Sequence, residues 1–105
     1  MKNLSISYLR DGKQMEASIR GPLISLSAIN LKTELHTKVD PWDRLIVDLT
    51  KVTEIDTTAI NSLFQTQMRC ISKNAKMILK CQKNHPIKRL LRLTHAEGEF
   101  DIVLA

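Results

Sequence analysis

The sequence has few of the residues that build common phosphate, nucleotide and metal sites. Its 105 residues include only three glycines, which are too scattered for a phosphate-binding loop or a dinucleotide fingerprint. One Trp, one Tyr and two Phe leave few rings for stacking on bases, which argues against a single-strand nucleic-acid binder. The three histidines are dispersed, without His or Cys partners at metal spacing. We therefore expect no metal site and no cofactor.

Long apolar runs and paired cysteines are also missing. No stretch approaches the length of a transmembrane helix, and the N-terminal residues lack the pattern of a signal peptide. Cys70 and Cys81 have no CxxC spacing, and we expect both to be small buried thiols. The sequence thus predicts a cytoplasmic protein without membrane insertion. Its length favours one domain over residues 1–105.

Positive charge exceeds negative charge and gathers late in the sequence. There are 16 Lys and Arg against 11 acidic residues, a net charge of +5. The late basic positions are Lys73, Lys76, Lys80, Lys83, Lys88, Arg89 and Arg92. A solvated surface explains such a face more simply than binding to nucleic acid or an anionic membrane. We expect no direct contact with nucleic acid, and salt-sensitive binding would reverse that view.

The beginning of the sequence predicts a β-hairpin. Apolar and polar residues alternate over 4–8 and over 15–19, the two-residue period of a half-buried strand. Asp11-Gly12 between them is a turn signal. Gly21-Pro22 is expected to end the second strand.

A helix and a buried strand are predicted next. The serines of residues 24–27 can cap a helix that runs to about Lys38, and Asp40-Pro41 is expected to end it. The near-continuous apolar run from Arg44 to Leu49 is typical of a strand buried on both faces, followed by a polar connection over 50–54.

The central helix follows Asp56, and its apolar residues recur at helical spacing. The stripe expected to face the core consists of Ile60, Leu63, Phe64, Gln67, Met68 and Ile71. The residues expected to face away are Asn61, Ser62, Gln65, Thr66 and Arg69.

The last third of the sequence repeats the strand-helix-strand order. Residues 77–81 form a short apolar strand, and 84–86 open a helix with Asn84 as candidate cap and Pro86 in the first turn. Residues 100–104 alternate as a strand that could lie at a sheet edge. The order β-β-α-β-α-β-α-β predicts an α/β domain with a mixed, mostly parallel sheet of about five strands, an N-terminal hairpin, and three to four covering helices.

The junction at residues 55–60 is the strongest candidate functional feature. It places two adjacent hydroxyls, Thr57 and Thr58, at a helix N-terminus, where unpaired N–H groups and the helix dipole tolerate negative charge. One interpretation is a phosphorylation switch. The alternative is that Asp56 and Thr57 simply cap the helix, a common role for both residue types.

With this order of elements, the sequence resembles the STAS family, the small α/β domain of bacterial anti-sigma factor antagonists and related modules. The resemblance is carried by Gly21-Pro22-Leu23, by the strand 45–49 with Val52, by Ile55-Asp56-Thr57-Thr58-Ala59-Ile60, and by the segment 84–94. It implies that Thr57 matches the family's phosphoacceptor and Asp56 the acidic residue before it. Ala59 departs from the family's usual Gly, and its methyl group could narrow the approach of a partner backbone.

The resemblance and the predicted sheet end together suggest a partner-docking surface. Loops at one end of an open α/β sheet commonly carry function. The candidate residues around Thr57 are Gly21, Pro22, Ser25, Thr53, Glu54, Asp56, Thr58, Asn61 and Ser62.

Two functions follow from the resemblance. The first is a phospho-regulated protein-binding module in a bacterial partner-switching pathway, bound by an anti-sigma factor or a serine/threonine protein kinase and reset by a cognate phosphatase. The second is a STAS subunit of an ABC-type lipid-transport complex that binds the transporter ATPase. Enzymatic activity is not expected, because Asp48 and Asp56 have no nucleophile or base beside them in the sequence pattern.

Overall fold

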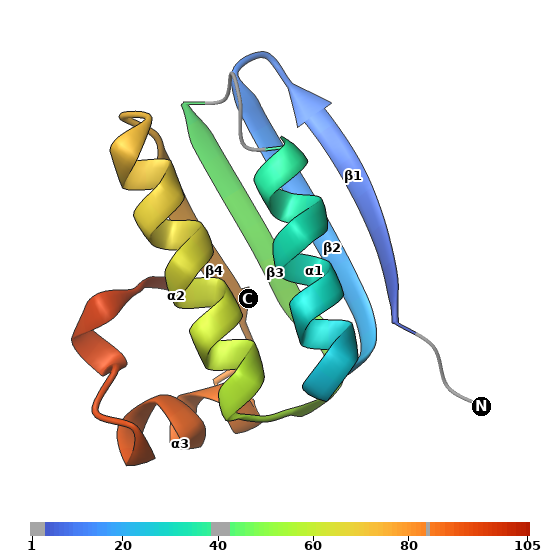
Figure 1. The fold of residues 1–105 in the computed structure, drawn as a ribbon, viewed down its shortest axis with the longest axis vertical. Helices are drawn as coiled ribbons and strands as arrows, with labels where there is room; N and C mark the ends of the chain where they lie inside the picture. Colours follow the sequence, from blue (N-terminus) through green and yellow to red (C-terminus); the bar gives the residue numbers. More distant parts are fainter. Residues whose placement is uncertain (1–3, 39–42, 84) are drawn as a thin grey trace.

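The structure is a computed structural model that describes residues 4–38, 43–83 and 85–105 (Figure 1). Its elements follow the predicted order with one added short 3₁₀ helix. They are β1 (Ser5–Asp11), β2 (Gln14–Leu23), α1 (Ser25–Lys38), β3 (Arg44–Ile55), α2 (Thr57–Ser72), β4 (Lys76–Cys81), α3 (Pro86–Leu93), η1 (Glu97–Glu99) and β5 (Asp101–Leu104).

The five strands form one mixed sheet in the order β1-β2-β3-β4-β5. β1 and β2 are antiparallel and make the predicted hairpin, and every other neighbouring pair is parallel. β5 lies at the edge, as its position in the sequence suggested. The predicted fold class is confirmed.

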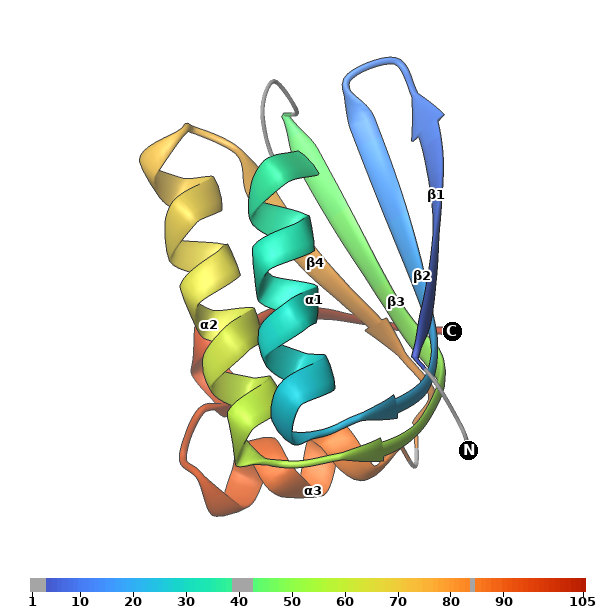
Figure 2. The same ribbon diagram turned by 45° about the vertical axis from the view of Figure 1, so that its right-hand side comes forward.

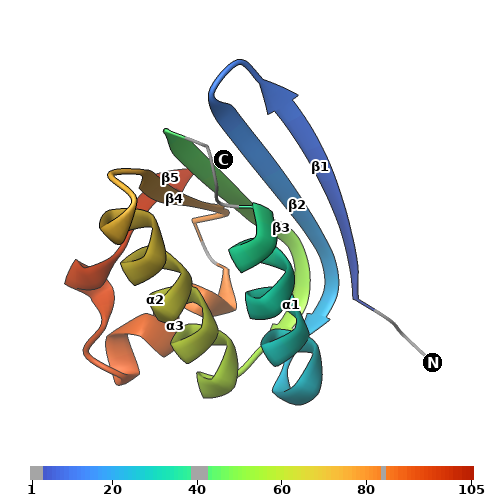
Figure 3. The same ribbon diagram turned by 45° about the horizontal axis from the view of Figure 1, so that its top comes forward.

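The helices lie on one face of this sheet. Parallel strands that are neighbours in chain order need crossovers of the same hand, which places their helices on the same side. α1 and α2 lie side by side over the sheet, and α3 lies near the end where β2 and β3 finish (Figures 1, 2 and 3). None of the described helices covers the opposite face, which is called the open face below (Figure 2).

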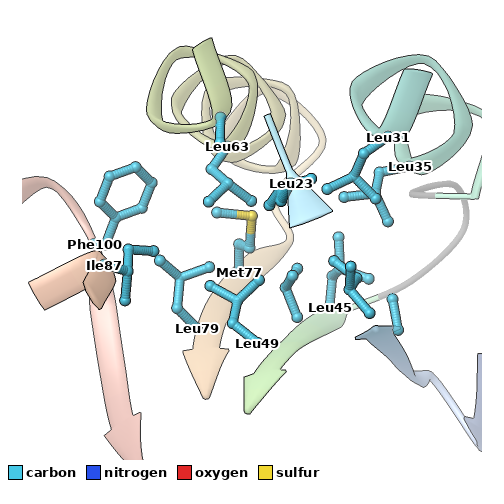
Figure 4. Packing of buried hydrophobic residues seen from close by; sticks show 14 of the residues in the cluster. Leu23, Leu31, Leu35, Leu45, Leu49, Leu63, Met77, Leu79, Ile87 and Phe100 are labelled. Carbon is cyan, nitrogen blue, oxygen red and sulfur yellow. The ribbon is translucent and has the colours of Figure 1, made fainter. Parts of the chain in front are cut away.

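The core lies between the helices and the face of the sheet that they cover (Figure 4). Every second residue is buried over 15–19 of β2, 45–49 of β3 and 77–81 of β4, among them Leu45, Val47 and Leu49. The prediction that β3 is buried on both faces is therefore wrong, because Ile46 and Asp48 are only half-buried on the open face. Apolar content alone does not report whether a second helical layer exists.

The strands β2 and β3 are longer than predicted. Gly21-Pro22 does not end β2, which continues to Leu23, and the polar segment 50–54 is part of β3. Gly21 has φ 106°, a conformation that suits glycine, and the β2–β3 register shifts beside it. Pairing between strands therefore overrides both turn signals. The predicted helix stop at Asp40-Pro41 and the predicted cap at Asn84 lie outside the described residues.

α2 buries only part of its predicted apolar stripe: Ile60 and Leu63 face the core as predicted, and the rest of the stripe does not. Phe64, Met68 and Ile71 are 37%, 49% and 57% exposed, whereas Ser62 and Thr66 are buried. Small side chains let this helix approach its neighbours closely. The buried hydroxyl of Thr66 is paired, because Thr66 Oγ1 donates a hydrogen bond to Ser62 O at 2.8 Å. The helix therefore buries a mixed face and leaves an apolar stripe in solvent.

Both cysteines are buried, as expected from the sequence. Burial raises the pKa of the Cys70 thiol to about 11 and also raises the pKa of Cys81. Neither thiol is therefore a reactive thiolate near neutral pH.

Candidate functional site

Asp56 ties together the beginnings of two helices. It is the N-cap of α2 in extended conformation, and its Oδ1 accepts a hydrogen bond from Ala59 N at 3.0 Å. Its other oxygen, Oδ2, accepts from Ser25 N at 2.9 Å, the first residue of α1. One carboxylate therefore satisfies an otherwise unpaired amide in the first turn of each helix and faces both positive dipole ends.

The loop before α1 is held by a second set of hydrogen bonds. Ser27, the third residue of α1, accepts from Ile24 N at 3.1 Å through its Oγ, which also donates toward Pro22 O and Ile24 O. The prediction of a serine N-cap is wrong, because Ser27 lies inside the helix and the amide of Ser25 bonds Asp56. Ser25 instead takes a left-handed conformation with φ 49°, which is uncommon for a residue with a side chain. The loop geometry thus depends on its hydrogen bond to Asp56.

Thr57 is the first residue of α2 and is exposed. Asp56 provides the cap, so the interpretation in which Asp56 caps the helix is correct for that residue. Within the described part of the chain, the Thr57 hydroxyl has no hydrogen bond. Its side chain is therefore not required to hold the helix start.

A hollow of about 300 Å³ lies directly beside Thr57. α2 supplies one wall and the segment after α3 supplies the other. The lining residues are Thr57, Ile60, Asn61, Phe64, Thr94, His95, Ala96 and Glu99. The wall after α3 is fixed by backbone hydrogen bonds, including Ala96 N to Leu91 O at 2.8 Å. We call this feature the Thr57 hollow.

Sequence reasoning found only part of this hollow. The missing wall, Thr94 to Glu99, lies far along the chain from Thr57, and no pattern in one sequence connects the two segments. Phe64 was expected in the core, but it stands at the rim and meets the buried Phe100 edge to face, with ring centroids 6.4 Å apart.

The candidate docking residues gather at one end of the fold, with one exception. β2–β3 pairing brings Pro22 opposite Glu54, and the Asp56–Ser25 hydrogen bond joins the two loops. The exposed candidates are Ser25, Thr53, Glu54, Thr57 and Asn61, and the partly exposed ones are Gly21, Pro22, Asp56 and Thr58.

The exception is Ser62, which is 4% exposed. The prediction that Ser62 belongs to the exposed first turns is wrong. It lies five positions after Thr57, on the side of α2 that turns inward with Ala59, Leu63 and Thr66.

His85 is a buried polar residue that sequence reasoning missed. It is the N-cap of α3: its Nδ1 accepts from Ile87 N at 3.1 Å, and its Nε2 lies 3.2 Å from Val52 O. Since Nδ1 accepts, Nε2 carries the proton and donates to Val52 O. Burial lowers the pKa of His85, with smaller opposing effects of backbone hydrogen bonds. The neutral ring therefore links α3 to β3 beside the candidate docking loops.

Residues 4–38, 43–83 and 85–105 contain no group of three or more His, Cys, Asp or Glu side chains placed to hold a metal ion. In the same ranges, no helix has the length and apolar character needed to cross a membrane.

Comparison with known families agrees with this geometry. The family model described as STAS domain matches residues 11–104, nearly the whole chain. The chain belongs to the STAS family. No curated protein sequence matches it.

Several solved structures share the fold at low sequence identity. An anti-sigma factor antagonist from Mycobacterium paratuberculosis superposes with a TM-score of 0.82 at 16% identity, covering 95% of this chain and 85% of that one. A putative anti-sigma factor antagonist from Thermotoga maritima gives 0.83 at 16% identity, with 95% and 86% covered. The Bacillus cell fate determinant SpoIIAA in its phosphorylated form gives 0.73 at 8% identity, with 96% and 91% covered. These likenesses establish the fold.

Proposed function

We propose that this STAS domain is a phospho-regulated protein-binding module of the anti-sigma factor antagonist type, switched by phosphorylation of Thr57. The observation that supports the proposal is the position of the Thr57 side chain and its lack of a structural role. Its side chain is exposed at a helix N-terminus, has no structural hydrogen bond within the described residues, and borders the Thr57 hollow. A kinase can therefore reach the hydroxyl without disturbing the cap that Asp56 provides.

The switch works through local electrostatics. A phosphate on Thr57 adds about −1.5 to −2 charges at neutral pH. In the free domain it stands in water next to the positive end of the α2 dipole. In a complex it is buried against the partner beside the Asp56 carboxylate, and an uncompensated buried charge costs several kcal/mol, whereas a tenfold change in affinity takes only about 1.4 kcal/mol.

The proposed partner surface combines the exposed candidates with the Thr57 hollow. Ser25, Glu54 and Asn61 offer polar contacts at its edge, while Ile60 and Phe64 line the hollow with apolar surface. Interfaces of this kind place an apolar centre inside a polar rim. The partner is an anti-sigma factor or a serine/threonine protein kinase, and a cognate phosphatase restores the unmodified state. Solved STAS relatives include an antagonist in phosphorylated form, which supports this assignment.

The test starts from the native cell. A tagged chain is purified with its partners, and mass spectrometry identifies the partner and the modification state of Thr57. Thr57→Ala and Thr57→Glu are then titrated into the purified partner, with Thr33→Glu on the exposed middle of α1 as a control of equal charge. We expect Thr57→Ala and Thr33→Glu to bind normally and Thr57→Glu to lose at least tenfold in affinity. Equal affinity of all three variants refutes the switch. Stable recovery of an ABC transporter ATPase, with Thr57 unmodified, favours the transporter-subunit function instead.

A further inference from the structure

The open face of the sheet has a second hollow, which shares no lining residue with the Thr57 hollow. Its volume is about 360 Å³. The residues that line it are Ser5, Ser7, Ser18, Ile19, Arg20, Asp48 and Lys51, and all but Ile19 are polar or charged. In β2 and β3 these residues lie next to buried ones, and in β1 Ser5 and Ser7 alternate with the half-buried Ile6 and Tyr8. This alternation places them on the open face. We call it the open-face hollow.

Strand register brings its polar groups together. Ser7 pairs with Ser18 and Ser18 with Asp48, while Ser5 pairs with Arg20 and Arg20 with Lys51. Three hydroxyls, two cations and one carboxylate therefore stand on adjacent strands, close enough to contact one small molecule.

A β-bulge is responsible for the position of Lys51. Between the pairs Ser18–Asp48 and Arg20–Lys51, β2 advances by two residues and β3 by three, so β3 contains one extra residue. The Asp48 carboxylate holds this irregularity, because its Oδ1 accepts from Thr50 N at 2.9 Å and from Thr50 Oγ1 at 2.7 Å. The bulge brings the exposed Lys51, rather than Thr50, opposite Arg20.

The two cations are not neutralised by the protein. Like charges directly opposite each other in a sheet are destabilising. Within the described ranges neither Arg20 nor Lys51 forms an ion pair, although Glu16 and Lys80 do so on the same face at 3.9 Å. A concave site with two facing cations and several hydroxyl donors matches the needs of a phosphate group, which accepts charge-assisted hydrogen bonds from such groups.

We propose that the open-face hollow binds a phosphate group attached to a hydroxyl-bearing carbon chain, of the glycerol phosphate or sugar phosphate type. The phosphate lies between Arg20 and Lys51 and accepts hydrogen bonds from serine hydroxyls. Asp48 has an oxygen, Oδ2, without a hydrogen bond in the described part of the chain, and it accepts from a hydroxyl of the ligand. A phosphate ester that carries hydroxyls offers this carboxylate a neutral donor away from the charged phosphate oxygens, whereas inorganic phosphate can reach it only through a P–OH of the anion itself. The ester therefore binds more tightly than inorganic phosphate.

The site does not depend on Thr57 or on the proposed switch. It lies on the strand residues just before the docking loops, since Arg20 precedes Gly21 and Lys51 precedes Thr53 by two positions. A ligand there joins β2 to β3 at the point where both strands lead toward those loops.

The experiment measures binding to the full chain at low ionic strength. The probes are glycerol 3-phosphate, inorganic phosphate, and vesicles of phosphatidylglycerol or phosphatidylcholine. Lys51→Gln and Arg20→Gln are compared with Lys83→Gln, which removes the same charge from another exposed position. We expect saturable binding to the wild type and to Lys83→Gln, with at least a tenfold loss for Lys51→Gln and Arg20→Gln.

The outcomes separate the two sources of this chemistry. Binding of free glycerol 3-phosphate identifies a soluble ligand, and binding only to phosphatidylglycerol vesicles identifies a lipid headgroup; both support the site. Lys51→Gln should also raise the melting temperature without ligand, because it removes the repulsion between the facing cations. The proposal is overturned if no probe binds saturably, if Lys51→Gln and Lys83→Gln bind alike, or if inorganic phosphate binds as tightly as glycerol 3-phosphate.

Discussion

Replacing Asp56 should lower the stability of the domain at two helix starts at once. Loss of an N-cap side chain costs about 1 kcal/mol. The second hydrogen bond, from Ser25 N to Oδ2, adds a similar amount of about 1 kcal/mol for a partly exposed bond to a charged acceptor. We therefore expect Asp56→Ala to reduce the free energy of unfolding by about 2 kcal/mol, or about 10 °C in melting temperature for a domain of this size.

Asp56→Asn separates the two contributions. Its side chain keeps one acceptor oxygen and gains a donor, so it can accept from Ala59 N or Ser25 N but not from both. The expected loss is about 1 kcal/mol. Urea denaturation followed by circular dichroism gives both values, and amide hydrogen exchange should show faster exchange at Ser25 and Ala59. The exposed Asp43 provides the control, because Asp43→Ala should change stability by less than about 0.5 kcal/mol.

The two variants test the two hydrogen bonds of Asp56 separately. Wild-type stability in Asp56→Asn would show that the bond to Ser25 contributes nothing. A loss below about 0.5 kcal/mol in Asp56→Ala would contradict the account for both helices.

Three further predictions concern stability. The pKa of His85 is lowered in the folded state, so the folded protein favours the neutral ring. The stability that the neutral ring contributes is present above the unfolded pKa of about 6.5 and is lost as pH falls below it. Unfolding free energy should therefore drop between pH 7 and pH 5, and less steeply in His85→Asn; parallel curves for the two proteins would contradict this. His36, whose pKa is lowered by burial and by Arg69 and Lys32, leaves some pH dependence in that variant. Ser25→Gly should stabilise by about 0.5–1 kcal/mol in thermal unfolding, because φ 49° suits glycine; a loss of stability would argue against that conformation. Leu63→Ala should cost about 3 kcal/mol and Phe64→Ala under about 1 kcal/mol in urea denaturation, since only Leu63 is fully buried; the reverse order would restore the sequence-based stripe.

Local patterns in the sequence predict the elements and their order well. Alternation over residues 4–8 and 15–19 and the Asp11-Gly12 turn specify the hairpin, because both signals concern neighbours in the chain. The bounds are less predictable. Gly21-Pro22 and the polar segment 50–54 look like strand ends, yet the two segments pair with each other, and that pairing is a long-range property.

Side-chain burial on α2 shows a second limit. Helical spacing identifies the apolar residues but not the direction of the core when neighbours pack against both flanks of a helix. Thr66 is buried because its hydroxyl bonds back to the helix, whereas Ile71 is left in solvent. The Thr57 hollow was not predicted for a related reason: its second wall comes from residues 94–99, which only tertiary packing brings beside Thr57.

The proposed control of partner binding by charge on Thr57 can be measured on the phosphorylated protein itself. The chain carrying phosphothreonine at position 57 and the unmodified chain are titrated calorimetrically into the same purified partner, with circular dichroism to show that both are equally folded. We expect phosphorylation to weaken binding at least a hundredfold, which corresponds to about 2.7 kcal/mol, while melting temperatures stay within a few degrees of each other. Equal affinity of the two forms for that partner would contradict it.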